Sequence, residues 1–166
     1  MTKPIVSIVM GSDSDLEIMR EAGTALEEFG IAYEMDIASA HRSPARTSDF
    51  ARNAVQRGIK VIIAGAGGAA HLAGVIAAET TLPVIGVPIP STSLQGLDSL
   101  LAIVQMPAGI PVATVAIGKA GATNAGILAA QMLALGDDDI AQKLLEHKRK
   151  LANSVEEKSK KLQKAK

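Results

Sequence analysis

Short apolar runs and stretches with helical periodicity alternate five times along this chain, and no other feature restricts its fold as strongly. The expected strands lie at residues 4–10, 31–38, 60–65, 83–88 and 112–118. The expected helices lie at residues 15–30, 44–58, 69–80, 96–105 and 120–135. Strands that alternate with helices at this spacing are typical of βαβ units, which build a parallel sheet. The sequence therefore predicts an α/β fold with one doubly wound, three-layer parallel sheet of about five strands.

The composition indicates how this sheet and its helices pack. Apolar residues make up 48% of the chain, yet it has no tryptophan, one tyrosine and two phenylalanines. A core of Ala, Val, Ile, Leu and Met suits closely packed layers of helix on sheet. The first, third and fifth strands show little alternation of apolar and polar residues, so we expect both of their faces to be buried.

Three absences restrict the class of protein. Without cysteine, the chain has no disulfide, no cysteine-bound metal and no thiol nucleophile. The first residues turn polar after a short apolar run, so we expect no signal peptide. No apolar run approaches the roughly 18 residues of a membrane helix. We therefore expect a cytoplasmic protein without a membrane partner.

Residues 137–166 differ from the rest, and we expect them to form an additional C-terminal helix after an α/β domain that spans residues 1–136. Asp137 can cap the start of this helix. Apolar residues then recur at steps of four and seven and form one narrow seam: Ile140, Leu144, Leu151, Val155 and Leu162. Because little of its own domain is left for this seam to cover, we expect it to pack on a neighbouring subunit of a homo-oligomer.

The net charge of the chain is zero, but the charges are unevenly distributed. Residues 1–142 carry 14 acidic and 8 basic side chains, whereas residues 143–166 carry 3 acidic and 9 basic ones. Basic tails can bind nucleic acid, but this tail lacks the aromatic residues on which bases stack. We interpret the basic excess as the solvated face of a helix and expect no nucleic-acid partner.

Polar and glycine-rich turns follow the five expected strands: GSDSD, SAHRSP, GAGGAAHLAG, PIPSTSLQG and GKAGATNAG. In a doubly wound sheet such turns gather at the carboxyl edge of the strands, where ligands bind near the point at which strand order reverses. The backbone N–H groups and hydroxyls of GSDSD suit a phosphate or ribose hydroxyls. The same residues could instead only cap the helix that follows.

Common nucleotide and signalling motifs do not fit these turns. The third turn has Ala70 where a dinucleotide fingerprint has its last glycine, and no acidic residue ends the next strand. The fifth turn lacks the hydroxyl residue after Lys119 that a Walker phosphate loop requires. A phosphoacceptor domain would need an aspartate at the end of the third strand, where this chain has AGAGG. The three histidines do not cluster with carboxylates in the sequence, so we expect no metal site.

His41 and Arg42 are the strongest candidates for chemistry. Histidine titrates near neutral pH and can accept and release a proton, while arginine offers a fixed fork for a phosphate or carboxylate. Pro44 can begin a helix whose N-terminus favours an anion. The alternative is a turn in which His41 only binds backbone. His71 could be a donor in the site or a residue at the start of a helix that packs locally, and the sequence favours neither interpretation. We expect His147 on the surface of the C-terminal helix.

Several of these motifs, taken in order, resemble the PurE family of N5-carboxyaminoimidazole ribonucleotide mutases from about Ile5 to Leu135. They are GSDSD, SAHRSP, GAGGAAHLAG, GVP, DSLLAIVQMPAGIPVATVAIGKAGATNA and AAQMLAL. The resemblance implies a flavodoxin-like fold, an octamer and a reaction without cofactor or metal. In that reaction a carboxylate moves from the N5 amine to C4 of an imidazole ring during purine biosynthesis, with CO2 as a trapped intermediate. A small dry pocket would keep this CO2 from escaping.

The resemblance also implies roles for individual residues. His41 would handle protons. The residues implied to bind the ribonucleotide substrate are Ser12, Asp15 and Arg42 at the ribose phosphate, Ser39 and Ala40 beside the ring, and Gly67, Gly68, Ala70, His71 and Leu72 on the side of the ring and CO2.

Three positions depart from the usual motifs of the family. Ser43 keeps a hydroxyl in SAHRSP, Ala73 in HLAG should loosen the helix after the glycine-rich turn, and Ala108 in MPAG removes a charge. None of them coincides with the implied proton carrier or phosphate anchors. Two alternatives to a mutase stay open: a direct CO2-dependent carboxylase of the same fold, and a non-catalytic module that binds a small ligand.

Overall fold

The computed structural model describes residues 3–164 of the chain. Its strands are β1 (Val6–Met10), β2 (Tyr33–Ile37), β3 (Val61–Gly67), β4 (Val84–Ile89) and β5 (Ala113–Thr114). Its helices are α1 (Leu16–Glu28), α2 (Pro44–Arg57), α3 (Leu72–Glu79), α4 (Leu97–Val104), α5 (Lys119–Ala134) and α6 (Asp138–Lys164), and the 3-10 turn η1 (Asp13–Asp15) precedes α1. Strands and helices alternate as predicted, so the α/β fold class is confirmed.

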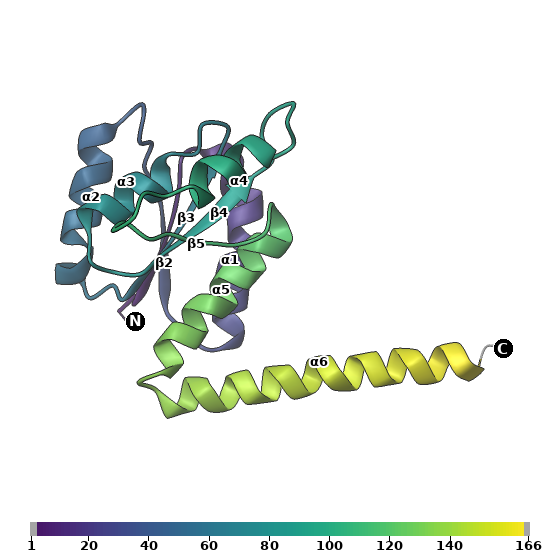
Figure 1. The fold of residues 1–166 in the computed structure, drawn as a ribbon. Helices are drawn as coiled ribbons and strands as arrows, with labels where there is room; N and C mark the ends of the chain where they lie inside the picture. The colour runs from purple at the N-terminus through teal and green to yellow at the C-terminus, as the bar shows by residue number, and fades with distance from the viewer. Residues whose placement is uncertain (1–2, 165–166) are drawn as a thin grey trace.

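The five strands form one parallel sheet in the order β2-β1-β3-β4-β5. Helices α1 and α5 cover one face of the sheet, and α2, α3 and α4 cover the other, which gives three layers (Figure 1). The chain reverses its direction of travel across the sheet between β1 and β3. Ligands of doubly wound sheets bind beyond the carboxyl ends of the strands at such a point. The topology therefore places a candidate site between the loops that follow β1 and β3.

Two hydrophobic cores, one on each face of the sheet, hold the layers together. Strands β1, β3 and β4 are buried almost throughout, as expected for the interior of a parallel sheet. Small residues bring α1 and α5 close together. A Cβ added to Gly126 of α5 would lie 2.6 Å from the carbonyl oxygen of Ala22 and 2.8 Å from the Cβ of Ala25, both on α1. The richness in alanine and glycine thus reflects direct contact between helix backbones.

The bounds of the strands differ from the prediction by one to a few residues, and two of these differences have a clear cause. β3 continues to Gly67, because its last residues pair with β4 even though glycine disfavours strands. The prediction for β5 is wrong in length and burial: it has two paired residues, both half-buried, at the edge of the sheet. Beyond β5 the chain continues alongside β4 and is held there by isolated backbone hydrogen bonds. The Val115 N–H donates to the carbonyl oxygen of Gly86, and the Gly118 N–H donates to that of Pro88.

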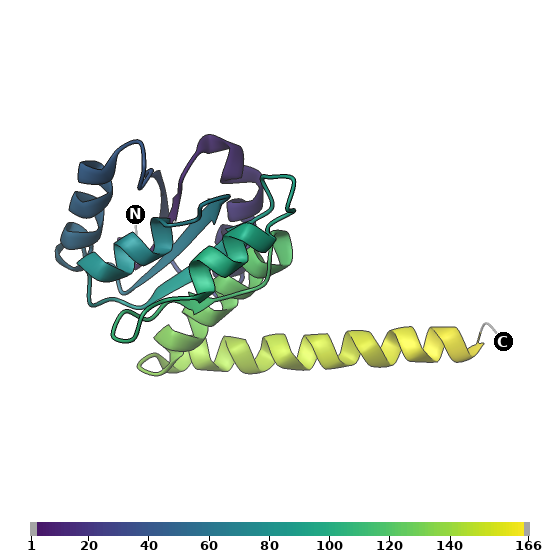
Figure 2. The same ribbon diagram turned by 45° about the horizontal axis from the view of Figure 1, so that its top comes forward.

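Helix α6 leaves the domain as one long helix (Figures 1 and 2). Asp137 caps it as predicted, because its carboxylate accepts the N–H groups of Asp139 and Ile140, each at 3.1 Å. Ile140 is 7% exposed and belongs to the core on the α1 and α5 face, and Leu144 packs against that core. The expectation that the seam packs on another subunit is therefore wrong for these two residues.

The rest of the seam is exposed in the single chain: Leu151, Val155 and Leu162. Residues 165 and 166, which were expected at the end of this helix, lie outside the described residues. Among residues 3–164, no helix has both the length and the hydropathy needed to cross a membrane.

His147 is largely covered, contrary to the expectation of a surface position. Its ring packs edge-to-face on Phe29 with 5.5 Å between the ring centroids, and its Nδ1 lies 3.6 Å from a carboxylate oxygen of Glu28. Nearby, the Lys143 ammonium donates to the backbone oxygen of Phe29 at 2.8 Å. The first turns of α6 thus dock on the C-terminal end of α1.

Candidate active site

A cavity of about 320 Å³ lies at the carboxyl edge of the sheet, bordered by the loops after β1, β2, β3 and β4. The predicted site residues that line it are Ser12, Asp15, Ser39, Ala40, His41, Arg42, Gly67, His71 and Leu72. The other two predicted residues do not line it: Ala70 is buried, and Gly68 turns the chain with a φ of +59°. The topology thus brings together turns that are far apart in the sequence.

The loop between β2 and α2 is a turn fixed by two serines. The Ser43 N–H and hydroxyl both donate to the carbonyl oxygen of Ser39, at 2.9 and 3.1 Å, and the Ser43 hydroxyl accepts the Ser39 N–H at 3.2 Å. The Ser39 hydroxyl accepts the backbone N–H and the Nε–H of Arg42 at 3.2 and 3.3 Å. Arg42 Nη2 donates to the carbonyl oxygen of Gly11 at 2.7 Å. These bonds hold the guanidinium at the β1–α1 turn and leave further N–H donors for an anion.

His41 and His71 form a pair within the cavity. His41 Nε2 lies 2.8 Å from His71 Nδ1, and the rings meet edge-to-face with their centroids 4.9 Å apart. One of these nitrogens donates a hydrogen bond to the other, and the tautomers of the two rings decide which of them is the donor. His71 therefore lies in the site with the proposed proton carrier, and not in a core.

The GSDSD turn caps the helical turn that follows it and also borders the cavity. The Ser12 hydroxyl caps η1 by accepting the Ser14 N–H at 3.4 Å, and Ser12 also lines the cavity. Asp15 is 6% exposed as a residue, and its carboxylate accepts the Ser14 hydroxyl at 3.2 Å. Burial raises the pKa of Asp15, although its hydrogen bonds and the charge of Arg42 oppose the rise.

Replacing Asp15 with Asn is expected to stabilise the fold at neutral pH. Because burial raises the pKa of this carboxyl above its ordinary 3.8, the folded state binds the proton more tightly than the unfolded state. The folded state therefore loses stability as the pH rises from about 3.8, the ordinary pKa of the carboxyl, through the raised pKa that it has in the folded state. Asparagine removes this loss and keeps an oxygen that can accept from Ser14.

The measurement is thermal unfolding of both proteins from pH 4 to pH 8. The melting temperature of Asp15→Asn should exceed that of the unchanged chain at pH 8, and the two should converge as the pH falls to 4. A difference of the same size at every pH would show that burial of the charge is not its cause.

Five further residues line the cavity that were not predicted from the sequence: Gly11, Ser14, Ala66, Ala69 and Ser91. Ser91 is the most informative, because the β4–α4 loop brings it so close to Gly67 that a Cβ there would overlap the Ser91 side chain. The polar turn PIPSTSLQG is the signal that the sequence offers. Which of its hydroxyls faces the cavity depends on the path of the loop.

The cavity opens to solvent in the single chain, where His41, Arg42, His71 and Ser91 are all exposed. The prediction of a small dry pocket therefore does not hold for the chain alone. Another surface would have to cover these side chains to exclude water from the site.

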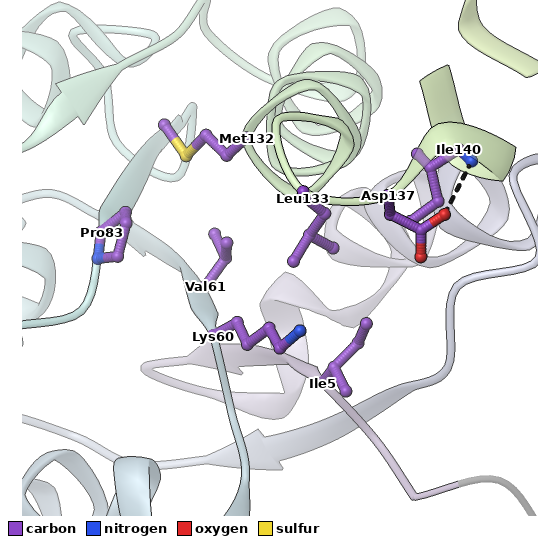
Figure 3. A pocket seen from close by; sticks show the side chains of 9 residues that line it. Ile5, Lys60, Val61, Pro83, Met132, Leu133, Asp137 and Ile140 are labelled. Atoms are coloured by element: carbon purple, nitrogen blue, oxygen red, sulfur yellow. Dashed lines mark hydrogen bonds between the residues drawn. The ribbon is translucent and has the colours of Figure 1, made fainter. Parts of the chain in front are cut away.

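A second cavity, of about 270 Å³, lies at the amino ends of the strands (Figure 3). Its lining includes the apolar Ile5 and Leu133 with the charged Lys60 and Asp137. No histidine among the described residues lines it, so proton transfer points to the cavity at the opposite edge, which holds His41 and His71. Within residues 3–164, no group of three or more His, Cys, Asp or Glu side chains could hold a metal ion.

Comparisons with known proteins found relatives that match nearly the whole chain. A family model described as AIR carboxylase matches residues 5–154. The N5-carboxyaminoimidazole ribonucleotide mutase of Pyrococcus horikoshii is 58% identical over 97% of this chain and 90% of its own length. The mutase of the same name from Bacillus subtilis is 57% identical over 95% of this chain and 97% of its own length. The crystal structure of Treponema denticola PurE matches with a TM-score of 0.86 at 32% identity, over 96% of this chain and 98% of that one.

Proposed function

The chain belongs to the AIR carboxylase family, and we infer that it converts N5-carboxyaminoimidazole ribonucleotide into 4-carboxy-5-aminoimidazole ribonucleotide in purine biosynthesis. The observation that carries this inference is the likeness, over nearly the whole chain, to mutases that are more than half identical to it. The resemblance to the PurE family that the motifs indicate is thereby confirmed.

The reaction delivers one proton and removes another. When the N–C bond of the carbamate breaks, CO2 leaves, and N5 keeps the bonding electrons and takes a proton. C4 of the resulting aminoimidazole attacks CO2 to form a C–C bond and then loses its own proton, which restores aromaticity. His41 is the proposed carrier, because once it has donated at N5 it is in the state that accepts the proton from C4. Its hydrogen bond to His71 supports this role by fixing the orientation of its ring.

Arg42 and the β1–α1 turn are proposed to hold the ribose phosphate. Arg42 is already held by Gly11 and Ser39, so binding a phosphate orders no free side chain and costs less entropy. The Ser12 hydroxyl, next to Gly11, donates to the Asp13 carboxylate at 3.0 Å in the free chain and would turn to the phosphate when the substrate binds. The Asp15 carboxylate suits the ribose hydroxyls, because it repels a phosphate.

We expect this reaction to need neither a cofactor nor a metal. The carboxyl group arrives on the substrate and passes through CO2, so no activated carrier is required. No electrons are transferred to or from the substrate, so no redox partner is required. We propose the cytoplasm as the compartment, with which a chain without cysteine is compatible.

A direct carboxylase is the second candidate, because the matching family model carries that description. A substrate comparison separates the two. Freshly made N5-carboxyaminoimidazole ribonucleotide is supplied in one reaction, and aminoimidazole ribonucleotide with bicarbonate in another. Fast product formation only in the first supports the mutase, fast net carboxylation in the second supports the carboxylase, and no product in either would indicate a binding module.

We propose that the chain assembles as a homo-oligomer, with an octamer as the expected size. Two apolar surfaces of the single chain support this proposal. The α4 stripe consists of Leu94, Leu97, Leu101 and Val104, and the exposed part of the α6 seam consists of Leu151, Val155 and Leu162. Exposed apolar surfaces of this kind mark contacts between proteins. The α4 stripe begins in the loop that carries Ser91, so a subunit docked there would border the open cavity.

Replacing Leu151, Val155 and Leu162 together with Ser is expected to lower the mass of the oligomer in light scattering. The change removes apolar area from the α6 seam, and each leucine or valine contributes about 1.5–3 kcal/mol when it is fully buried. The matched control replaces three exposed basic residues on the opposite face of the same helix, Arg149, Lys160 and Lys164, with Ser and should keep the mass. An unchanged mass and melting temperature in the seam variant would show that the seam makes no contact.

A further inference from the structure

The β4–α4 loop, residues 90–96, forms one wall of the cavity through Ser91. The end of this loop is conformationally costly. Gln95 and Gly96 both have positive φ angles, +51° and +91°, and Gln95 is the one non-glycine residue within 3–164 with such an angle. For a residue other than glycine, such a backbone conformation costs on the order of 1–3 kcal/mol, and it persists only where the surrounding structure fixes it.

The first turn of α4 holds the loop at two places. At its base, the buried Ser99 hydroxyl lies 3.1 Å from the carbonyl oxygen of Ile89 and 2.9 Å from that of Gly96. In its middle, the Thr92 hydroxyl donates to Asp98 Oδ2 at 2.7 Å. This bond lowers the pKa of Asp98 more than burial raises it, so the acceptor at neutral pH is a carboxylate.

Thr92 connects this anchor to the glycine-rich turn on the opposite wall. Its hydroxyl accepts the Leu94 N–H at 3.3 Å, and its carbonyl accepts the Gln95 N–H at 3.0 Å. Its methyl carbon faces Gly68, where an added Cβ would lie 3.5 Å away. The preceding residue, Ser91, lies directly against Gly67. The path of the loop at Thr92 therefore decides how tightly the two walls meet.

We propose that Thr92 and Asp98 are positioning residues for the carboxyl transfer, because their hydrogen bond keeps Ser91 against Gly67 and closes this wall of the cavity. Neither residue lines the cavity itself. If the bond is lost, the loop can move away from the glycine-rich turn, and CO2 can leave before C4 attacks it. The enzyme then releases aminoimidazole ribonucleotide in place of product. This consequence rests on the proposed mutase reaction.

The experiment uses Thr92→Val, which keeps the shape of the side chain and removes the hydroxyl. Freshly made N5-carboxyaminoimidazole ribonucleotide is supplied, and aminoimidazole ribonucleotide and product are both quantified after subtraction of the loss without enzyme. We expect their ratio to rise about tenfold, the effect of losing one hydrogen bond to a charged group. Thr92→Ser, which retains the hydroxyl, should restore the ratio. Ser93→Ala, which lies on the same loop but whose hydroxyl bonds none of the residues described, should leave the ratio unchanged.

A second pair of variants tests whether the bond itself is responsible. Asp98→Ala should raise the same ratio, and the double variant Thr92→Val/Asp98→Ala should raise it no further, because both changes remove one interaction. Amide hydrogen exchange in residues 90–96 should also become faster in Thr92→Val, and this measurement does not depend on activity.

An unchanged ratio and unchanged exchange in Thr92→Val, or additive effects in the double variant, would overturn the proposal. If the unchanged chain forms no product, the assigned reaction fails. The exchange rates then still decide whether this bond holds the loop.

Discussion

His41→Asn is expected to stop turnover while the fold and the binding of substrate are retained. Asparagine has a similar polar shape, but it cannot carry a proton at neutral pH. General acid–base groups contribute about 10²–10⁴ to the rate, so kcat should fall by at least about 10². KM should stay close to its original value, because His41 is assigned to proton transfer and not to the phosphate. Steady-state kinetics with fresh N5-carboxyaminoimidazole ribonucleotide measure both constants.

The matched control is His147→Asn, which changes a histidine that packs on Phe29 and does not line the cavity. This variant should keep its kcat. Near-normal turnover in His41→Asn would sink the assignment of His41 as proton carrier. If calorimetry with aminoimidazole ribonucleotide instead shows that binding is lost, His41 is a binding residue.

Arg42→Ala is expected to raise KM by about tenfold to a hundredfold, with a smaller effect on kcat. Hydrogen bonds to charged groups contribute about 1.5–3 kcal/mol, and every 1.4 kcal/mol changes an affinity tenfold. Alanine removes both the charge and the fork that Gly11 and Ser39 hold in place. Lysine keeps the charge without the fork, so Arg42→Lys should give an intermediate KM.

Arg46→Ala provides the comparison for this prediction. Arg46 is four residues further along, but its guanidinium pairs with Asp36 at 2.7 Å and does not line the cavity. Its loss should leave KM unchanged. An unchanged KM in Arg42→Ala, or an equal rise in both variants, would argue against a phosphate-binding role for Arg42.

Much of the fold was predictable because buried parallel strands have a strong local pattern. β3 and β4 are continuous apolar runs and Ser7 alone interrupts the apolar residues of β1, which is what burial on both faces favours. β5 has similar residues, but pairing with a neighbour decides where a strand ends, and Val115 already lies beyond the last paired residue. The docking of α6 was equally hidden, because the contact of His147 with Phe29 joins segments far apart in the chain.

The location of the candidate site was predictable, but its internal contacts were not. The motifs indicated that residues after the strands would meet at one edge, because parallel strands place their carboxyl ends together. No pattern in either motif indicates that a nitrogen of His41 meets one of His71, since 30 residues separate them. Ser91 was missed for the same reason: its place beside Gly67 follows from the path of a loop with unusual backbone angles.

Helix α6 also bears on how copies of this chain would come together in the proposed oligomer. It has 27 residues, which correspond to about 40 Å at roughly 1.5 Å per residue. Its docking contacts lie near its start, at Ile140, Leu144 and His147, so most of the helix projects straight outward (Figure 2). A straight helix cannot fold back to cover its own leucines. Assembly would therefore join surfaces that are already formed in the single chain. Its rate should depend on protein concentration and should not be limited by a further folding step.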